Sequence, residues 1–129
     1  MTFEMKLELV PVPVADVDRA KDFYVHKLGF NADHDHKINE NLRFVQLTPP
    51  GSACSIVIGE GITKMEPGSQ QGLQMVIADA DTAHDELKSR GVEVSDVEDM
   101  DWGRFVYFSD PDGNSWALQE LPDYSKSNK

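Results

Sequence analysis

The chain has 129 residues, of which 40% are hydrophobic, and it carries a formal net charge of −11. These values predict one globular domain or two small modules with a shared core, and the negative charge argues against binding to nucleic acids or anionic membranes. The single cysteine, Cys54, excludes an intrachain disulfide, and the absence of a visible signal peptide or membrane-length apolar run predicts a cytoplasmic protein.

The first half of the sequence predicts a strand, a helix and three more strands. Residues 6–14 alternate toward their end and are rich in valine, which is typical of a strand, although Pro11 and Pro13 restrict it to a sheet edge or a bulge. Asp16 is the predicted N-cap of a helix that ends at Gly29. Further strands are expected at residues 30–36, 42–47 and 54–58, with a turn at Gly51.

The second half repeats this order. A strand over residues 73–77 precedes Asp79, the predicted N-cap of a helix that ends at Gly91. Strands are then expected at residues 92–97, 105–108 and 115–120, and the acidic segment 96–101 is interpreted as a solvated loop, with a lid as the alternative. The predicted organisation is a first module over residues 1–60, a linker over 61–71, a second module over 72–121 and a polar tail over 122–129.

Two short motifs that occur in both halves indicate that the halves are copies of one unit. Residues 14–22 (VADVDRAKD) and 77–85 (IADADTAHD) share five of nine residues at an offset of 63. Pro-Pro-Gly at 49–51 and Pro-Asp-Gly at 111–113 follow the same order at an offset of 62. Each copy has an amphipathic helix and strands with one apolar face, so each must be covered by other elements.

The turn motif Asp110-Pro111-Asp112-Gly113 makes this duplication specific for a family. Together with the helix that starts at Asp16, it resembles the vicinal oxygen chelate superfamily of glyoxalase I, bleomycin-resistance proteins and extradiol dioxygenases, over residues 6–121. The resemblance implies an α+β fold of two tandem βαβββ modules that form a curled, partly closed mixed sheet with helices on the outside. It also implies a small-molecule site inside the sheet, and commonly a homodimer.

Metal-using members of this superfamily hold the metal with four side chains, usually histidine and glutamate. The resemblance places the equivalent positions at Leu9, Ser55, Gly72 and Ala117. None of these residues supplies the imidazole, carboxylate or thiolate that zinc, nickel, iron or manganese requires. A shift of each position by one residue assembles no three good ligands either. We therefore expect no metal and no other cofactor, and we assign no catalytic residue.

The predicted ligand-binding residues occupy the strand positions that face the concave side of the sheet. Small and apolar residues leave room there, and Ser55, Gln74 and Gln119 give direction, which is the usual composition of a ligand pocket. The alternative is a packed interior without space for a ligand. The aromatic residues Trp102, Phe105 and Tyr107 could equally belong to the core or to a dimer contact. The set is Leu9, Pro11, Ser55, Val57, Gly72, Gln74, Trp102, Phe105, Tyr107, Ala117 and Gln119.

The sequence thus favours a metal-independent small-molecule-binding protein that sequesters an antibiotic or an aromatic metabolite and acts as a cytoplasmic homodimer. The expected ligand is planar or amphipathic, and the net negative charge suits a cation. The enzymatic alternative is a glyoxalase-like lyase or isomerase, or a dioxygenase-like enzyme, with a non-standard site. A third hypothesis is a regulatory subunit that binds a protein partner through its sheet. His34 and His36 are interpreted as solvated strand residues.

Overall fold

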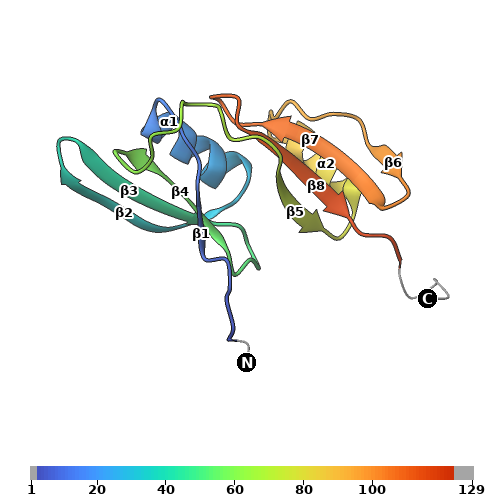
Figure 1. Cartoon of the computed structure of the whole chain (residues 1–129). Helices are drawn as coiled ribbons and strands as arrows, with labels where there is room; N and C mark the ends of the chain where they lie inside the picture. Colours follow the sequence, from blue (N-terminus) through green and yellow to red (C-terminus); the bar gives the residue numbers. More distant parts are fainter. Residues whose placement is uncertain (1–2, 124–129) are drawn as a thin grey trace.

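The computed structural model describes residues 3–123, in which two βαβββ modules lie side by side (Figure 1). This arrangement confirms the predicted α+β fold class. Of the predicted polar tail, residues 124–129 lie outside the described residues. The first module contains β1 (Leu9–Pro11), α1 (Val17–Asp22), the π-helical turn η1 (Phe23–Lys27), β2 (Asn31–Asn39), β3 (Leu42–Thr48) and β4 (Ser55–Glu60). The second contains β5 (Leu73–Ile77), α2 (Ala80–Ser89), β6 (Glu98–Met100), β7 (Gly103–Ser109) and β8 (Ser115–Glu120).

Each module folds its strands into one four-stranded mixed sheet. The strand order is β1-β4-β3-β2 in sheet A and β5-β8-β7-β6 in sheet B. In each sheet the first and last strands of the module pair in parallel, and the other pairs are antiparallel. The two sheets remain separate and do not close a barrel, so β1 and β5 are both edge strands. The connection between the modules crosses the top of the view in Figure 1.

The two helices begin and end in the same way. The carboxylate of Asp16 accepts a hydrogen bond from Arg19 N at 3.1 Å, and that of Asp79 accepts one from Thr82 N at 3.0 Å. Both helical segments run out at a glycine with a φ of +82°, Gly29 and Gly91, where an L side chain would be strained. The N-cap aspartates and the glycines therefore determine where the two helical segments begin and end. No helix within residues 3–123 is long and apolar enough to cross a membrane.

The second module departs from prediction after α2. Residues 92–97 form no strand, and β6 lies instead within the acidic segment 96–101, so both of these predictions are wrong. The reason is the tight hairpin that places Met100 opposite Gly103, since pairing then proceeds outward from that turn. In addition, β1 is shorter than the predicted span 6–14, and β2 extends to Asn39.

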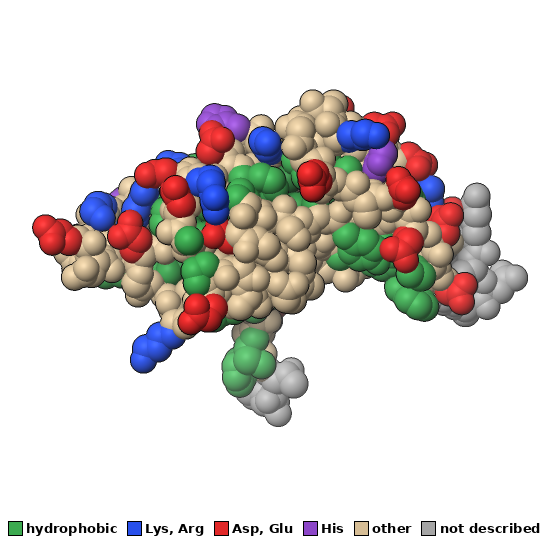
Figure 2. Space-filling model, turned by 90° about the horizontal axis from the view of Figure 1, so that it is seen from above, with side chains coloured by type: hydrophobic (Ala, Val, Ile, Leu, Met, Phe, Trp, Pro, Cys, Tyr) green, Lys and Arg blue, Asp and Glu red, His purple; other side chains and the backbone are tan. Residues whose placement is uncertain are grey.

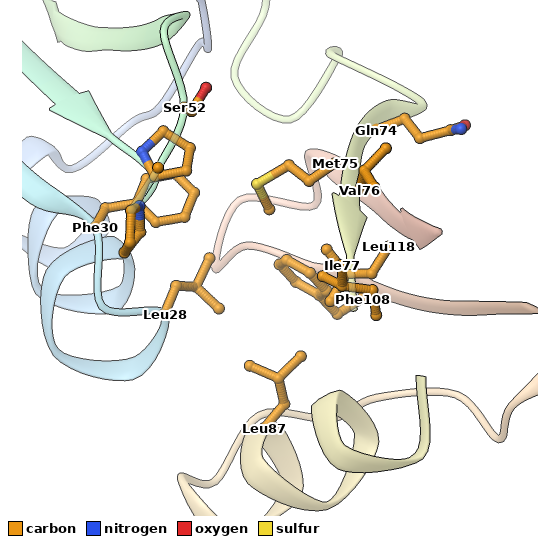
Figure 3. Close-up of a pocket in the computed structure, with 13 residues that line it drawn as sticks. Leu28, Phe30, Ser52, Gln74, Met75, Val76, Ile77, Leu87, Phe108 and Leu118 are labelled. Carbon is orange, nitrogen blue, oxygen red and sulfur yellow. The ribbon is translucent and has the colours of Figure 1, made fainter. Parts of the chain in front are cut away.

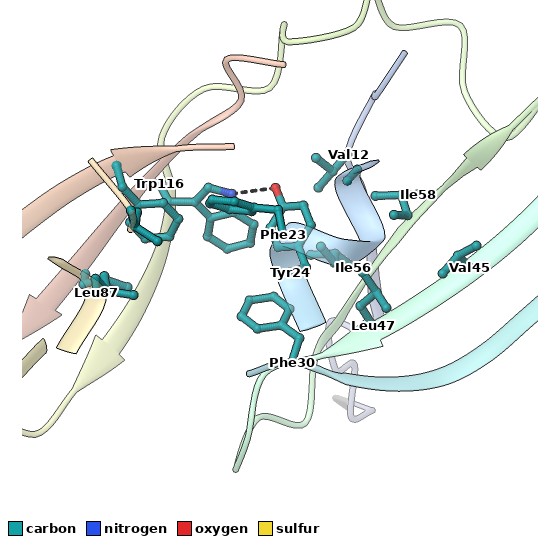
Figure 4. Packing of buried hydrophobic residues seen from close by; sticks show 14 of the residues in the cluster. Val12, Phe23, Tyr24, Phe30, Val45, Leu47, Ile56, Ile58, Leu87 and Trp116 are labelled. Atoms are coloured by element: carbon teal, nitrogen blue, oxygen red, sulfur yellow. Dashed lines mark hydrogen bonds between the residues drawn. The ribbon is translucent and has the colours of Figure 1, made fainter. Parts of the chain in front are cut away.

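The hydrophobic core spans both modules (Figure 4). Aromatic rings from η1 and the segment after it meet rings from β7 and β8: the Tyr24 and Trp116 centroids lie 5.9 Å apart, and those of Phe30 and Trp116 lie 6.0 Å apart. Phe108 stacks on Trp116 at 6.2 Å. The first module thus covers part of the helix side of sheet B, and burial of these rings ties the modules together.

A buried hydrogen-bond network reinforces this junction. Trp116 Nε1 donates to the Tyr24 hydroxyl at 3.0 Å, and that hydroxyl donates to Asp110 Oδ2 at 2.7 Å. Asn114 Nδ2 donates both to Asp110 Oδ2 and to the Pro13 carbonyl, each at 2.8 Å. Burial and the neighbouring Asp110 carboxylate raise the pKa of Tyr24. The Asp-Pro-Asp-Gly motif is therefore both a turn and a clamp between the modules.

Candidate ligand-binding site

The predicted site residues on strands lie on the sheet faces opposite the helices, which we call the open faces. Successive residues of a strand point to opposite sides, and Ile56, Ile58, Trp116 and Leu118 belong to the helix-side core. Their neighbours consequently form the open faces. Described by strand position, the open face of sheet A contains Leu9, Pro11, Phe44, Gln46, Thr48, Ser55 and Val57, and that of sheet B contains Gln74, Val76, Phe105, Tyr107, Ala117 and Gln119.

The predicted residues fall into two groups, one on each sheet. In sheet A, Leu9 lies opposite Ser55 and Pro11 lies opposite Val57. In sheet B, Gln74 lies opposite Ala117, which also faces Tyr107, while Gln119 faces Phe105. Among the described residues, no hydrogen bond or ring contact joins one group to the other. One chain therefore brings together each half of the predicted set but not the two halves.

The open face of sheet B is an aromatic surface with a polar edge. Phe105 and Tyr107 stack with centroids 6.0 Å apart and planes 4° from parallel. Phe105 is buried, whereas Tyr107 is 36% exposed and Trp102, in the turn before β7, is 60% exposed. These rings offer the faces and edges on which another planar ring stacks.

Two glutamines form the polar edge of this surface. Gln74 Nε2 donates to Gln119 Oε1 at 2.6 Å, and Gln119 Nε2 donates to the Trp102 carbonyl at 2.8 Å. Gln119 thereby holds the Trp102 turn in place. The second amide atom of the exposed Gln74 side chain has no hydrogen-bond partner within residues 3–123, so it is available to a ligand.

A hollow of about 470 Å³ adjoins this surface. Gly72, Tyr107, Ser115 and Ala117 line it, and Glu93 contributes a carboxylate. Its volume falls within the usual range for small-molecule sites, roughly 300–1,000 Å³. The small side chain of Ala117 and the absent one of Gly72 leave this space, and the Glu93 carboxylate favours a cation beside it.

The open face of sheet A is instead occupied by polar groups that satisfy each other. The hydroxyls of Thr48 and Ser55 are 2.6 Å apart, Gln46 Nε2 donates to Ser55 Oγ at 3.3 Å, and Thr48 donates to Asp33. The Thr48 hydroxyl and the Asn31 amide hold the pKa of Asp33 below its usual range. The alternation of residues 42–48 in the sequence could have identified Gln46 and Thr48 as open-face residues, because it places their side chains on the same face of the sheet as that of Ser55.

The strand register pairs only two of the four positions that the family resemblance predicts for metal ligands. Leu9 lies opposite Ser55, but the residue opposite Ala117 is Gln74 and not Gly72, whose N–H donates to Ser115 Oγ at 2.8 Å. A shift of two residues preserves the face. Neither version of the set offers imidazole, carboxylate or thiolate donors, so these residues do not fit a catalytic divalent metal.

No cluster of three or more histidine, cysteine, aspartate or glutamate side chains with metal-binding proximity occurs within residues 3–123. His34 and His36 stack with ring centroids 5.7 Å apart on the exposed strand β2. The Glu120 carboxylate lies on the helix side, where it accepts a hydrogen bond from Ala80 N at 2.8 Å. None of these residues completes a metal site on an open face.

A second hollow, of about 460 Å³, lies between the modules on the helix side (Figure 3). Leu28 and Phe30 form one wall, and Met75 and Ile77 form the other. In Figure 3 the Met75 side chain points into this inter-module groove and Gln74 points away from it. Sequence periodicity misses the groove because its walls come from segments more than 40 residues apart whose approach depends on the docking of the modules.

Comparisons with known proteins agree with this fold. The family model described as Glyoxalase/Bleomycin resistance protein/Dioxygenase superfamily matches residues 6–118. An uncharacterised protein of Bacillus subtilis, YetH, is 31% identical, with 86% of this chain and 94% of that protein covered. The crystal structure of TnmS3, an antibiotic binding protein from Streptomyces sp. CB03234, superposes with a TM-score of 0.86 at 36% identity, covering 95% of this chain and 100% of that one.

A glyoxalase/bleomycin resistance protein from the same Streptomyces strain gives a TM-score of 0.79 at 38% identity, with 89% of this chain and 100% of that chain covered. The duplicated capping frame, the two mixed sheets and the match over residues 6–118 lead to one conclusion. The chain belongs to the glyoxalase/bleomycin resistance protein/dioxygenase superfamily.

Proposed function

We propose that the protein binds a planar aromatic molecule on the open face of sheet B, and that binding itself is its function. The observation that carries this proposal is the combination of stacked Phe105 and Tyr107 rings, the exposed Trp102 ring and the solvent-exposed second amide atom of Gln74 on one surface. The similarity to TnmS3, described as an antibiotic binding protein, supports an antibiotic or an antibiotic-like metabolite as the ligand class.

The charge distribution favours a ligand that carries a positive charge. The chain has a net charge of −11, and Glu93 borders the hollow next to Tyr107. An ammonium group near Glu93 would gain Coulomb energy, while the rings would hold the aromatic part. The ligand is therefore a planar aromatic cation, with the Gln74 amide as its hydrogen-bond partner.

We also propose the homodimer that the sequence predicts. Within one chain, the group around Leu9 and Ser55 lies on sheet A and the aromatic group lies on sheet B. A second copy can place the open face of its sheet A against the aromatic face of sheet B. Such a dimer would complete the predicted set of ligand-binding residues and would exclude water from the stacked rings.

Ligand titration of the full chain tests this proposal. The probe is an anthracycline antibiotic with a free amine, compared with its neutral N-acetyl derivative, and the readouts are calorimetry and quenching of tryptophan fluorescence. Trp102 is 60% exposed and Trp116 borders the adjacent hollow, so quenching of tryptophan fluorescence reports a ligand bound on this face. We expect the amine form to bind more tightly than the neutral form.

Two variants define the site in this titration. Trp102→Ala should weaken binding about 2- to 10-fold, since one aromatic stacking contact contributes about 0.5–1.5 kcal/mol. The matched control is His26→Ala, which removes an exposed ring from η1, away from both open faces. Equal affinities of Trp102→Ala and the unaltered protein for every probe would contradict the assignment of the face.

The enzymatic alternative is tested separately. A glyoxalase-like or dioxygenase-like reaction would need a donor set other than the residues at Leu9, Ser55, Gln74 and Ala117. The measurement is turnover of the methylglyoxal–glutathione adduct, and of a catechol with oxygen, after reconstitution with zinc, nickel, iron or manganese. Turnover with one bound metal per chain would overturn the proposal that binding is the function.

A further inference from the structure

The open face of sheet B is polar at one end and aromatic at the other. Ser109 lies directly opposite Ser115 where β7 ends and β8 begins. The next open-face positions along β7 are Tyr107 and then Phe105, because alternate residues of a strand share a face. Strand β7 ends near the junction of the modules in Figure 1. The two serines therefore mark the junction end of this face, and the stacked rings mark its distal part.

Glu93 adds a carboxylate to the serine end. The segment before β6 runs beside β7, because Ser95 N donates to the Tyr107 carbonyl and Tyr107 N donates to Ser95 Oγ, each at 2.9 Å. Two residues earlier in the chain, Glu93 lies level with Ser109, and both line the hollow of about 470 Å³ together with Ser115. We call Glu93, Ser109 and Ser115 the polar end.

The polar end has hydrogen-bonding groups that the protein itself does not use. Within residues 3–123, the Glu93 carboxylate and the Ser109 hydroxyl have no hydrogen-bond or ion-pair partner. Ser115 Oγ accepts a hydrogen bond from Gly72 N at 2.8 Å, so its own O–H is available to donate to another group. One hollow thus presents an anionic acceptor and two hydroxyls to a ligand.

The charge around this hollow favours a cation. Glu93 and Asp110 border it, and no lysine, arginine or histidine of the described part of the chain does so. Figure 2 shows acidic side chains over both modules, and the chain has 23 aspartates and glutamates against 12 lysines and arginines. An ammonium group is therefore attracted both by the adjacent carboxylate and by the charge of the whole chain.

We propose that the polar end binds an amino sugar, and that the ligand of this protein is an aromatic glycoside whose planar rings lie on Phe105 and Tyr107. This inference rests on the proposed function, since it assigns the second part of the same ligand. The Glu93 carboxylate accepts hydrogen bonds from the ammonium group of the sugar. The hydroxyls of Ser109 and Ser115 bond to the sugar hydroxyls.

The dimensions of the face suit a ligand of this kind. Open-face residues that follow each other on a strand are about 7 Å apart along it, so Phe105 and Ser109 are separated by about 13 Å. A fused aromatic ring system joined to one sugar spans a distance of this order. Gly72 and Ala117 contribute little or no side chain to the hollow, which leaves room for a sugar ring beside Tyr107.

The two ends of the face also determine the orientation of the ligand. Aromatic rings placed at the polar end would remove water from the Glu93 carboxylate without giving it a partner, which is costly. A sugar placed on the stacked rings of Phe105 and Tyr107 would lose hydrogen bonds to water and gain none. The ligand therefore binds with its sugar toward the junction of the modules and its rings toward Trp102.

Three anthracycline probes test this inference by calorimetric titration of the full chain. They are an amino glycoside, the same glycoside with a hydroxyl in place of the amine, and the sugar-free aglycone. We expect the amino glycoside to bind at least about 10-fold more tightly than the aglycone, with the hydroxy glycoside between them. Equal affinities for the amino glycoside and the aglycone would overturn the amino-sugar assignment and leave the aromatic face intact. Binding of none of the three would contradict the proposed function as well.

Substitutions at the polar end locate the sugar. Glu93→Gln should lower the affinity for the amino glycoside at least threefold more than the affinity for the aglycone. The matched control is Glu40→Gln, which removes the same charge from the turn between β2 and β3 in the other module and should leave all three affinities unchanged. Ser109→Ala should weaken both glycosides more than the aglycone. An equal loss for all three probes in Glu93→Gln, or the same loss in Glu40→Gln, would contradict the position of the sugar.

Discussion

The two modules share a frame but use their open faces differently. Asp18 and Asp81 occupy equivalent positions in the repeat, and each binds an arginine of its own sheet at 2.9 Å, Arg43 in the first module and Arg104 in the second. On the open faces this equivalence ends. Ser55 is engaged by Thr48 and Gln46, whereas its counterpart Ala117 borders a hollow. The two modules therefore have the same local ion pair beside the helix, whereas the residues on their open faces differ.

The difference extends to the turns after β3 and β7. Asp110 directly follows β7 and Thr48 is the last residue of β3, and the two positions are equivalent at the offset of 62. Asp110 is buried and its carboxylate accepts hydrogen bonds from Tyr24, Asn114 and the backbone N–H of Asp112. Within residues 3–123, the Thr48 hydroxyl hydrogen bonds only with Asp33 and Ser55 of its own sheet. The residue that begins the turn therefore hydrogen bonds across the module junction in one copy and only within its own sheet in the other.

The largest expected effect tests the different roles of Asp110 and Thr48 in stability. Asp110→Ala should lower the free energy of unfolding by about 3 kcal/mol or more, because it leaves the Tyr24 hydroxyl and the Asn114 amide buried without acceptors. Thr48→Ala, the matched variant, should cost about 1 kcal/mol. Urea unfolding followed by circular dichroism measures both. Equal costs would mean that the junction does not depend on the Asp110 network.

The second prediction concerns the open faces. Ala117→Leu should fill the hollow beside Tyr107 and raise the dissociation constant of the anthracycline probe at least about 10-fold, equivalent to about 1.4 kcal/mol. Ser55→Ala should change it less than threefold, since Thr48 and Gln46 already occupy that hydroxyl. Circular dichroism checks that both variants fold. A larger effect of Ser55→Ala would move the principal ligand contacts to sheet A.

The helix ends and the faces of the strands were predictable from the sequence, because residues close by in the chain determine them. Asp16, Asp79, Gly29 and Gly91 cap helices through their own neighbours, and strand parity follows from alternation of side chains. The position of β6 was not predictable, because the hairpin before Gly103 sets its pairing with β7, whereas the valine-rich run at residues 92–97 forms no strand. Longer-range features depend on how the modules dock.

Those long-range features include the clamp and the groove. The sequence around Tyr24 does not indicate that its hydroxyl donates a hydrogen bond to Asp110, 86 residues away. The apolar groove likewise needs Leu28 and Met75 to approach from different modules. For the site, parity placed each residue on a sheet face, but it could not show that the two groups lie on separate sheets within one chain.

The third prediction tests what the modules share. Asp16→Ala and Asp79→Ala each remove a carboxylate that accepts one N–H of the first helical turn. Each variant should lower the free energy of unfolding by about 1 kcal/mol, the usual contribution of an aspartate N-cap. Because the core spans both modules, one cooperative urea transition is expected in each case. A difference greater than about 1 kcal/mol between the two costs would show that the caps are not equivalent.

The smallest expected effect compares two aspartate–arginine pairs in acid, one from each module. The hydrogen bonds from Arg43, and then from Lys21, hold the pKa of Asp35 well below its usual range, and Arg104 lowers the pKa of Asp81 more mildly. A carboxylate whose pKa falls on folding stabilises the folded state above its unfolded pKa, about 3.9, and this stabilisation is lost as the pH falls below that value.

Asp35→Asn should therefore cost about 1 kcal/mol near neutral pH, and the variant should lose less stability than the unaltered protein between pH 5 and about 2. Asp81→Asn should show the same sign with a smaller change, since the Asp81 side chain is 66% exposed, against 27% for Asp35, and solvent screens its interaction with Arg104. Urea midpoints across this pH range measure both variants. If Asp81→Asn flattened the acid dependence more than Asp35→Asn, Asp35 would not be the more strongly stabilised carboxylate, although it accepts hydrogen bonds from both Arg43 and Lys21.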